Sequence, residues 1–175
     1  MTRGWGWLVG LAMGLGCASG FAETGTARIK GTTEGSSVRG SAALTDTADG
    51  LRVAVQVEGV PPGAHGLHIH QYGGCGGGGQ AAGGHFNPAG APHGLLPKDG
   101  LTKAHPGDMG NIEVGGDGAG SLALILPGVT LGGGRYSVAG RAIVLHEKAD
   151  DFDQPTGNAG GRIGCGAIVI AAPGP

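Results

Sequence analysis

The stretch from His65 to Gly94, "HGLHIHQYGGCGGGGQAAGGHFNPAGAPHG", holds five of the seven histidines of the chain, eleven glycines and one cysteine. A tract rich in Gly and His can bind metal without a fixed shape. Alternatively, its histidines lie on strands, and glycine occupies the places where the backbone turns. In the strand-like segment "LHIHQY", His68 and His70 would share one face and form a pair of metal ligands. By itself this spacing fits two solvent-facing histidines equally well.

Short apolar runs recur on both sides of this stretch, among them "LRVAVQV", "SLALILP", "RAIVLH" and "GAIVIAA". Disordered tracts lack such runs, so they outweigh the warning given by 42 Gly and 10 Pro in 175 residues. Seven or eight short strands separated by turn signals such as "PPGAHG", without an amphipathic helix of twelve residues, predict an all-β sandwich or barrel. Residues 73–110 and "EKADDFDQPTGNAGGR" are expected to be long loops, and such loops are usually functional.

The first 22 residues have the pattern of a secretory signal. Arg3 precedes the apolar run "WLVGLAMGLG", and small residues lead to a cleavage position after Ala22. We therefore expect a signal peptide over residues 1–22 and one domain over residues 23–175, in a periplasmic or secreted protein. The alternative is a lipoprotein anchored through Cys17, because "GLGC" imperfectly resembles a lipidation signal. No later segment is long and apolar enough to span a bilayer.

Removal of the signal would take away Arg3 and leave 10 basic against 13 acidic residues, a formal charge of −3 with His neutral. We find no basic patch in the sequence and expect no nucleic-acid partner. Two cysteines, Cys75 and Cys165, would remain. An even number in an exported chain predicts one disulfide, and the alternative is two free thiols.

The loop after His70 contains a complete set of zinc ligands within 24 residues. The members of this set are His85, His93, His105 and Asp108. Three imidazoles and one carboxylate fill a tetrahedral site, and a closed site of this kind predicts a structural ion. Zinc would also supply free energy to hold so glycine-rich a loop in one shape. The alternative is a disordered loop with chance histidines.

A second set of imidazoles comes from two separate strands. His146 ends the strand "RAIVLH", and with His68 and His70 it makes an all-nitrogen site, which suits copper. A fourth nitrogen is needed, and His85 is the candidate because its ring has two nitrogens. Spacing alone does not show this. His65 has the opposite parity to His68, so we expect it to bond the backbone of the turn instead.

Five motifs carry a resemblance to a known family. "HGLHIHQYGGC", "GGHFNP", "HPGDMGN", "VLHEKADD" and "TGNAGGRIGCG" occur here in the order found in Cu/Zn superoxide dismutases, over residues 64–169. The chain therefore resembles that family. Its export signal and the short segment at residues 151–156 resemble the bacterial periplasmic branch.

The resemblance implies an eight-stranded Greek-key β-barrel, an immunoglobulin-like sandwich with two long functional loops. It implies one copper and one structural zinc per chain. It also implies dismutation of superoxide to oxygen and hydrogen peroxide by alternate reduction and re-oxidation of the copper. The implied copper ligands are His68, His70, His85 and His146. The implied zinc ligands are His85, His93, His105 and Asp108.

The resemblance also implies roles for residues beside the ligands. His85 would bridge both ions and carry a proton, and Arg162 would attract the anionic substrate. Asp150 would link one copper ligand to one zinc ligand, and a Cys75–Cys165 disulfide would tie the ligand loop to the barrel.

The chain departs from the family pattern in the 151–156 segment. It lacks the extra charged residues of the animal cytosolic enzymes, so Arg162 is expected to act with less help in attracting the substrate. The alternative function is an exported copper or zinc carrier with the same fold and no catalysis. A zinc hydrolase does not fit, because the zinc set is closed and no HExxH motif occurs. The sequence leaves open whether the protein is a monomer or a homodimer.

Overall fold

The computed structural model describes Met1 and residues 22–172. The expected signal peptide, with Cys17, therefore lies outside the described residues except for Met1 and Ala22. Eight strands are present: β1 (Thr24–Gly31), β2 (Arg39–Thr47), β3 (Gly50–Glu58), β4 (Gly63–His70), β5 (Asp108–Val114), β6 (Gly120–Leu126), β7 (Ala142–His146) and β8 (Arg162–Ile170). The helical elements are a 3₁₀ turn, η1 (Gln80–Ala82), and one α-helical turn, α1 (Leu96–Asp99). In the described part of the chain, no helix is long and apolar enough to cross a membrane.

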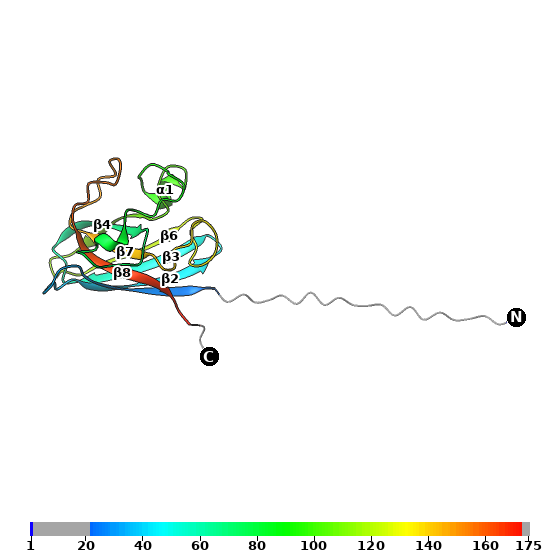
Figure 1. Cartoon of the computed structure of the whole chain (residues 1–175), viewed down its shortest axis with the longest axis horizontal. Coiled ribbons are helices and arrows are strands. Elements are labelled where there is room, and N and C mark those ends of the chain that lie inside the picture. Colours follow the sequence, from blue (N-terminus) through cyan, green and yellow to red (C-terminus); the bar gives the residue numbers. More distant parts are fainter. Residues whose placement is uncertain (2–21, 173–175) are drawn as a thin grey trace.

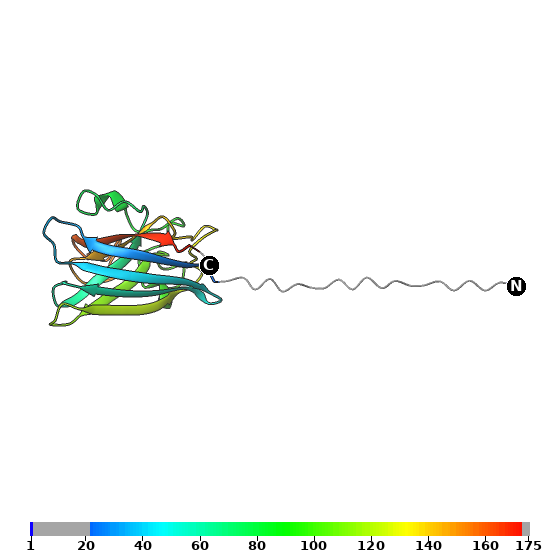
Figure 2. The same ribbon diagram turned by 90° about the horizontal axis from the view of Figure 1, so that it is seen from below.

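The strands close into an antiparallel barrel in the order β1-β2-β3-β6-β5-β4-β7-β8 (Figures 1 and 2). The chain passes β6 and β5 on its way from β3 to β4, and it passes β5 and β4 on its way from β6 to β7. These crossing connections make the barrel a Greek key. The eight-stranded Greek-key barrel expected from the sequence is confirmed.

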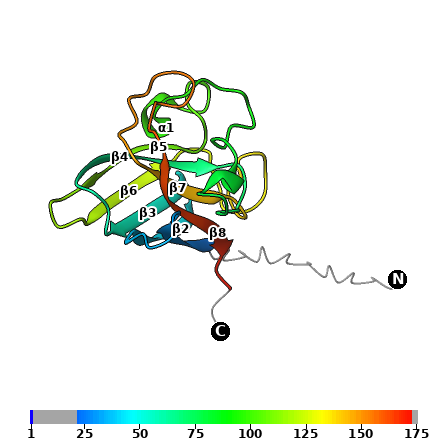
Figure 3. The ribbon, with the colours of Figure 1, turned by 60° about the vertical axis from the view of Figure 1, so that its left-hand side comes forward.

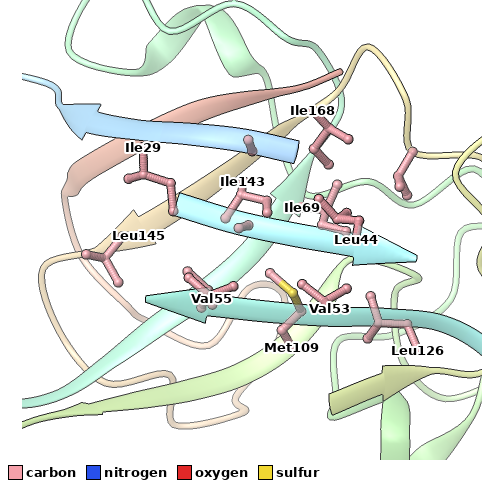
Figure 4. Close-up of a cluster of buried hydrophobic side chains, with 14 of the residues drawn as sticks. Ile29, Leu44, Val53, Val55, Ile69, Met109, Leu126, Ile143, Leu145 and Ile168 are labelled. Carbon is pink, nitrogen blue, oxygen red and sulfur yellow. The ribbon is translucent and has the colours of Figure 1, made fainter. Parts of the chain in front are cut away.

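The barrel interior is filled by aliphatic side chains. Along β3 every second residue is buried, and β7 is buried throughout. Figure 4 shows the packed interior, which includes Ile29, Leu44, Val53, Val55, Ile69, Met109, Leu126, Ile143, Leu145 and Ile168. This pattern follows from the period of two along a strand, which sends alternate side chains into the barrel.

Strand β4 is buried on both faces, unlike an ordinary half-exposed barrel strand. Its inward positions are apolar, at Leu67 and Ile69, whereas its outward positions are His68 and His70. Two loops, residues 71–107 and 147–161, lie together on the side of the barrel that carries β4 (Figures 1 and 3). They cover the outward histidines, so the same strand contributes to the core and to the site.

The predicted turn "PPGAHG" was wrong in its second half, because β4 begins at Gly63. The strand also ends at His70, before the predicted end at Tyr72. The register of the β4–β5 pairing shifts between Gly66 and His68. His65 pairs with Ile112 before the shift, and His68 pairs with Asp108 after it. Such a bulge cannot be seen in a pattern of alternating side chains.

Strand register brings the candidate site residues together. His68 pairs with Asp108 of β5 on one side and with Val144 of β7 on the other. His146 pairs with Arg162 across the β7–β8 ladder. Residues that lie up to 76 positions apart in the chain are thus direct neighbours.

Candidate metal centre

The predicted ligands form two buried clusters that share one residue. The first cluster consists of His68, His70, His85 and His146, and the second consists of His85, His93, His105 and Asp108. In each cluster the ligand atoms lie within 4.8 Å of one another. We refer to them as the four-histidine cluster and the mixed cluster. The structure therefore brings together every ligand that the sequence predicted.

Three members of the four-histidine cluster, His70, His85 and His146, are neutral imidazoles at neutral pH. Burial lowers the pKa of His70 to about 2 and that of His146 to about 3. Their Nε2 atoms face each other at 3.3 Å. The backbone carbonyls of Gly83 and Gly160 hold the Nδ1 atoms of these two rings, at 2.9 and 3.4 Å. Neutral imidazoles with converging nitrogens are the donor set that a copper ion needs.

The mixed cluster is organised by the carboxylate of Asp108. Its Oδ1 lies 3.2 Å from Nδ1 of His85 and 3.1 Å from Nδ1 of His105. Its Oδ2 accepts hydrogen bonds from the backbone amides of Gly94 and His105, at 3.0 and 2.9 Å. Although burial opposes ionisation, the three nearby histidines hold the pKa of Asp108 far below its usual range. A fixed anion among imidazoles suits a divalent cation.

His85 is the residue that joins the two clusters. Its Nδ1 faces Asp108, which leaves Nε2 for the four-histidine cluster. Burial lowers the pKa of His85 to about 4, and the Asp108 carboxylate only partly offsets this effect. His85 is therefore neutral in the metal-free protein at pH 7 and can bind metal ions through both ring nitrogens.

The carboxylate of Asp150 contacts one histidine of each cluster. Its Oδ2 lies 2.8 Å from Nε2 of His68, and its Oδ1 lies 2.9 Å from Nε2 of His93. Burial lowers the pKa of His93, but the carboxylates of Asp108 and Asp150 outweigh that effect and raise the pKa to about 9. Because each ring is held through Nε2, its Nδ1 is left for a metal ion, which is the usual arrangement around a ligand histidine.

Two orphaned nitrogens test whether metal ions fit these clusters. Nδ1 of His68 and Nδ1 of His93 are buried and have no hydrogen-bond partner. Nδ1 of His93 lies 2.9 Å from Oδ2 of Asp108, yet the geometry is not that of a hydrogen bond. A buried nitrogen without a partner is costly. One cation in each cluster would satisfy one of them, so the residues fit a metal pair.

Arg162 lies beside the four-histidine cluster in a pocket of about 430 Å³ that His70, His85 and His146 also line. Its two terminal nitrogens donate hydrogen bonds of 2.6 Å each to the carbonyls of Gly79 and Gly83. Burial lowers the pKa of Arg162 from its ordinary value. Arginine remains charged in proteins, so this guanidinium is a fixed cation at the edge of the cluster.

The predicted disulfide between Cys75 and Cys165 is confirmed, and it joins residues 90 positions apart with Cα atoms 5.7 Å from each other. It fixes the glycine-rich loop against β8. The carbonyls of Gly79 and Gly83, which hold Arg162, belong to that loop. The disulfide thus supports the position of Arg162 as well as the ligand loop.

Sequence reasoning identified Asp150 and the turn contact of His65, but it missed Asn111 and the contact of His65 with His146. The side-chain amide of Asn111 holds the backbone of Asp150 at both its N–H and its carbonyl, at 2.7 and 2.9 Å. His65 bonds the carbonyls of His146 and Pro61 at 2.9 and 2.8 Å, so it reaches beyond the turn to the four-histidine cluster. Asn111 lies within the motif "HPGDMGN", which was the one available signal.

A copper- and zinc-type donor pair, bridged by one histidine on a Greek-key barrel, defines a class of dinuclear metal proteins. The model of the copper/zinc superoxide dismutase family matches residues 38–168. The chain belongs to this family. A solved structure described as the clock protein EA4 is 36% identical in sequence, with a TM-score of 0.75. That match covers 92% of this chain and 100% of the other.

Proposed function

We propose that this chain is an exported enzyme that converts superoxide into oxygen and hydrogen peroxide. The observation that carries the proposal is the sharing of His85 between two buried clusters, one of them beside a fixed arginine. Copper in the four-histidine cluster would supply the one-electron redox chemistry, while zinc in the mixed cluster would keep its charge and stabilise the loop.

Arg162 is the residue that binds the anionic substrate. Its guanidinium is held by two carbonyls and lines the same pocket as three of the histidines, so it presents positive charge where superoxide must arrive. Glycines at positions 84, 160 and 161 also line the pocket. This arrangement favours a small anion over a bulky substrate.

His85 is the residue that holds and moves a proton. Its Nδ1 is fixed by Asp108, whereas its Nε2 faces the four-histidine cluster. Nε2 can therefore bind metal without a proton, or bind a proton when it is not a ligand, and then deliver that proton to the peroxide product. Asp150 keeps His68 and His93 in fixed orientations while this occurs.

The cellular location is part of the same proposal. The N-terminal sequence supports export to the periplasm or secretion, and the short segment at residues 151–156 supports the bacterial periplasmic branch. A lipid anchor at Cys17 is the alternative form of export.

A second candidate is a metal-binding protein without catalysis. The 36% identical structure is described as a clock protein, a description that names no enzymatic activity and concerns that protein alone. Against it, this chain keeps all four histidines of the first cluster and Arg162 in place.

Metal analysis and a superoxide-decay assay test the proposal together. We expect about one copper and one zinc in each chain. His146→Ala should abolish activity, and Arg162→Ala should lower it by about tenfold through loss of local positive charge. Arg28→Ala, which removes an exposed charge on β1, is the matched control and should not change the rate. A fully metal-loaded protein without activity would overturn the enzyme in favour of the carrier.

A further inference from the structure

The proposed function gives residues 151–156 no part in attracting the substrate. This segment contains two acidic residues, Asp151 and Asp153, and no Lys or Arg. Negative charges repel superoxide, so this segment does not attract the proposed substrate. Figures 1 and 3 show its loop on the same side of the barrel as the loop that contains α1. The described hydrogen bonds and ring contact from residues 151–156 to the other loop all involve one candidate zinc ligand, His93.

Gln154 holds the backbone of His93 at two points. Its Oε1 accepts a hydrogen bond from the His93 amide at 2.9 Å, and its Nε2 donates one to the His93 carbonyl at 2.8 Å. The two residues are 61 positions apart. This pair of hydrogen bonds resembles the pairing of two residues in an antiparallel sheet. It fixes both the position and the direction of the backbone that carries the ligand.

Phe152 covers the ring of His93. The two rings are stacked, with centroids 6.3 Å apart and planes inclined by 19°. The backbone amide of Phe152 donates to Oδ1 of Asp150 at 2.8 Å, the same oxygen that lies 2.9 Å from Nε2 of His93. Phe152 has a φ of 63°, a left-handed conformation that is unfavourable for a bulky residue. Strain of this kind persists only where surrounding contacts impose it.

These contacts enclose His93 from three directions. Gln154 holds its backbone, Phe152 covers its ring face, and Asp150 binds its ring edge. The ring can therefore swing away from the mixed cluster only after residues 151–156 have lifted. None of the other three residues of the mixed cluster makes a described hydrogen bond or ring contact with Phe152 or Gln154.

We infer that residues 151–156 form a latch that controls the release and uptake of zinc at His93. Phe152 and Gln154 are its positioning residues. The inference rests on the proposed function to the extent that the mixed cluster takes zinc. Residues 151–156 would thus retain zinc and would not attract the substrate.

Zinc release from the metal-loaded protein to a chromogenic chelator tests the latch. We expect Phe152→Ala and Gln154→Ala to release zinc about tenfold faster than the parent, since residues behind a metal ligand commonly have effects of this size. Copper release should not change. Gln154→Glu keeps the acceptor for the His93 amide but sets a negative charge against the His93 carbonyl, so it should also release zinc faster. Phe152→Tyr keeps the flat ring and should restore the parent rate.

Two matched variants separate the latch from general loosening. Tyr72→Ala removes an aromatic ring that is 60% exposed, and Gln56→Ala removes an exposed amide from β3, both away from His93. Neither should change zinc release. The absorption spectrum of the cobalt-substituted protein should be the same in Phe152→Ala and the parent, because the latch changes the rate of release and leaves the bound geometry intact.

Failure of the latch and failure of the proposed function give different results. If the parent holds zinc and dismutates superoxide, but the Phe152 and Gln154 variants release zinc at the parent rate, the latch is wrong and the enzyme stands. The latch is also wrong if copper release or the matched variants accelerate equally. A parent protein that binds no zinc in the mixed cluster would overturn both.

Discussion

Gly157 shows how a single residue without a side chain makes the site possible. Its φ is +73°, and a Cβ at this position would collide with Oδ1 of Asp150 and lie 2.6 Å from Nε2 of His93. Asp150 cannot move aside, because its other oxygen is bonded to His68. The backbone of the 147–161 loop can approach the carboxylate this closely only with glycine.

We predict that Gly157→Ala weakens zinc binding by roughly 10- to 100-fold, the range found when the support of a metal ligand is disturbed. Gly35→Ala is the matched control, since Gly35 has the same φ of +73° but open space around its Cβ position. Both variants carry the left-handed strain of about 1 kcal/mol. Zinc competition titrations and thermal unfolding measure the two effects. Equal zinc affinities in the two variants would show that the collision is unimportant.

The buried histidines predict acid sensitivity of the metal-free protein. In the unfolded chain they take up protons below a pKa of about 6.5. Burial lowers the pKa of His70, His85 and His146 to about 2, 4 and 3, so the folded state stays unprotonated. Stability therefore falls as the pH drops below about 6.5, by up to about 1.4 kcal/mol per pH unit for each group.

His93 contributes with the opposite sign. Its folded-state pKa is raised to about 9, so its stabilisation is complete below about pH 6.5 and is lost as the pH rises through 9. Urea unfolding of the chelator-treated protein should show a net loss of about 5 kcal/mol between pH 7 and pH 5, because the three lowered pKa values outweigh the raised one of His93. An unchanged midpoint over this interval would mean that these histidines are not buried as neutral groups.

At the scale of elements, the glycine-rich loop depends on a few attachments to the barrel. Within it, the amides of Gly79 and Ala82 bond carbonyls only three or four residues away, so these bonds do not fix the loop to its surroundings. The disulfide, the hydrogen bonds to Arg162 and the contact of the Gly83 carbonyl with His70 do so instead.

Replacing both Cys75 and Cys165 by Ser should therefore release this loop. Closing a loop of 90 residues is worth about 4 kcal/mol of stability in the chain-entropy description. We also expect faster hydrogen exchange at residues 74–84 in the metal-free variant, and a loss of activity in the loaded protein because Arg162 loses its fixed carbonyls. Unchanged exchange in this segment would show that other contacts are sufficient to hold it.

At the scale of the whole molecule, charge is distributed unevenly. Although the sequence shows no basic patch, strand pairing gathers Arg28, Lys30 and Arg39 around a hollow on the outer face of β1 and β2. In the barrel order β2 lies opposite β4, so this face points away from the candidate metal centre. The full sequence carries a net charge of −2, yet Arg162 places positive charge in the pocket.

The salt dependence of dismutation distinguishes local from net charge. If Arg162 and the bound ions govern the encounter, added salt screens an attraction and lowers the rate constant. If the net negative charge of the protein governs it, salt screens a repulsion and the rate constant rises. We expect a decrease in the parent, a weaker decrease in Arg162→Gln, and parent behaviour in Arg28→Gln. A rise with salt in the parent would contradict local attraction.

The sequence by itself determined the strands and the types of ligand. Short apolar runs indicate most of the strands, with clear alternation in β3, because such patterns are local properties of the sequence. The donor types of His68, His93 and Asp108 indicate copper and zinc chemistry without coordinates. The family motifs added the sharing of His85 between the two sets of ligands, which spacing alone left open.

Only the tertiary structure decided how these parts support one another. The bond from Asp150 to His68 spans 82 positions, that from Arg162 to Gly79 spans 83, and the pair formed by Gln154 and His93 spans 61. Contacts over such distances depend on strand register, on the β4 bulge and on loop packing. Local side-chain patterns carry no record of these, because any one loop sequence can close in many ways until the barrel fixes its ends.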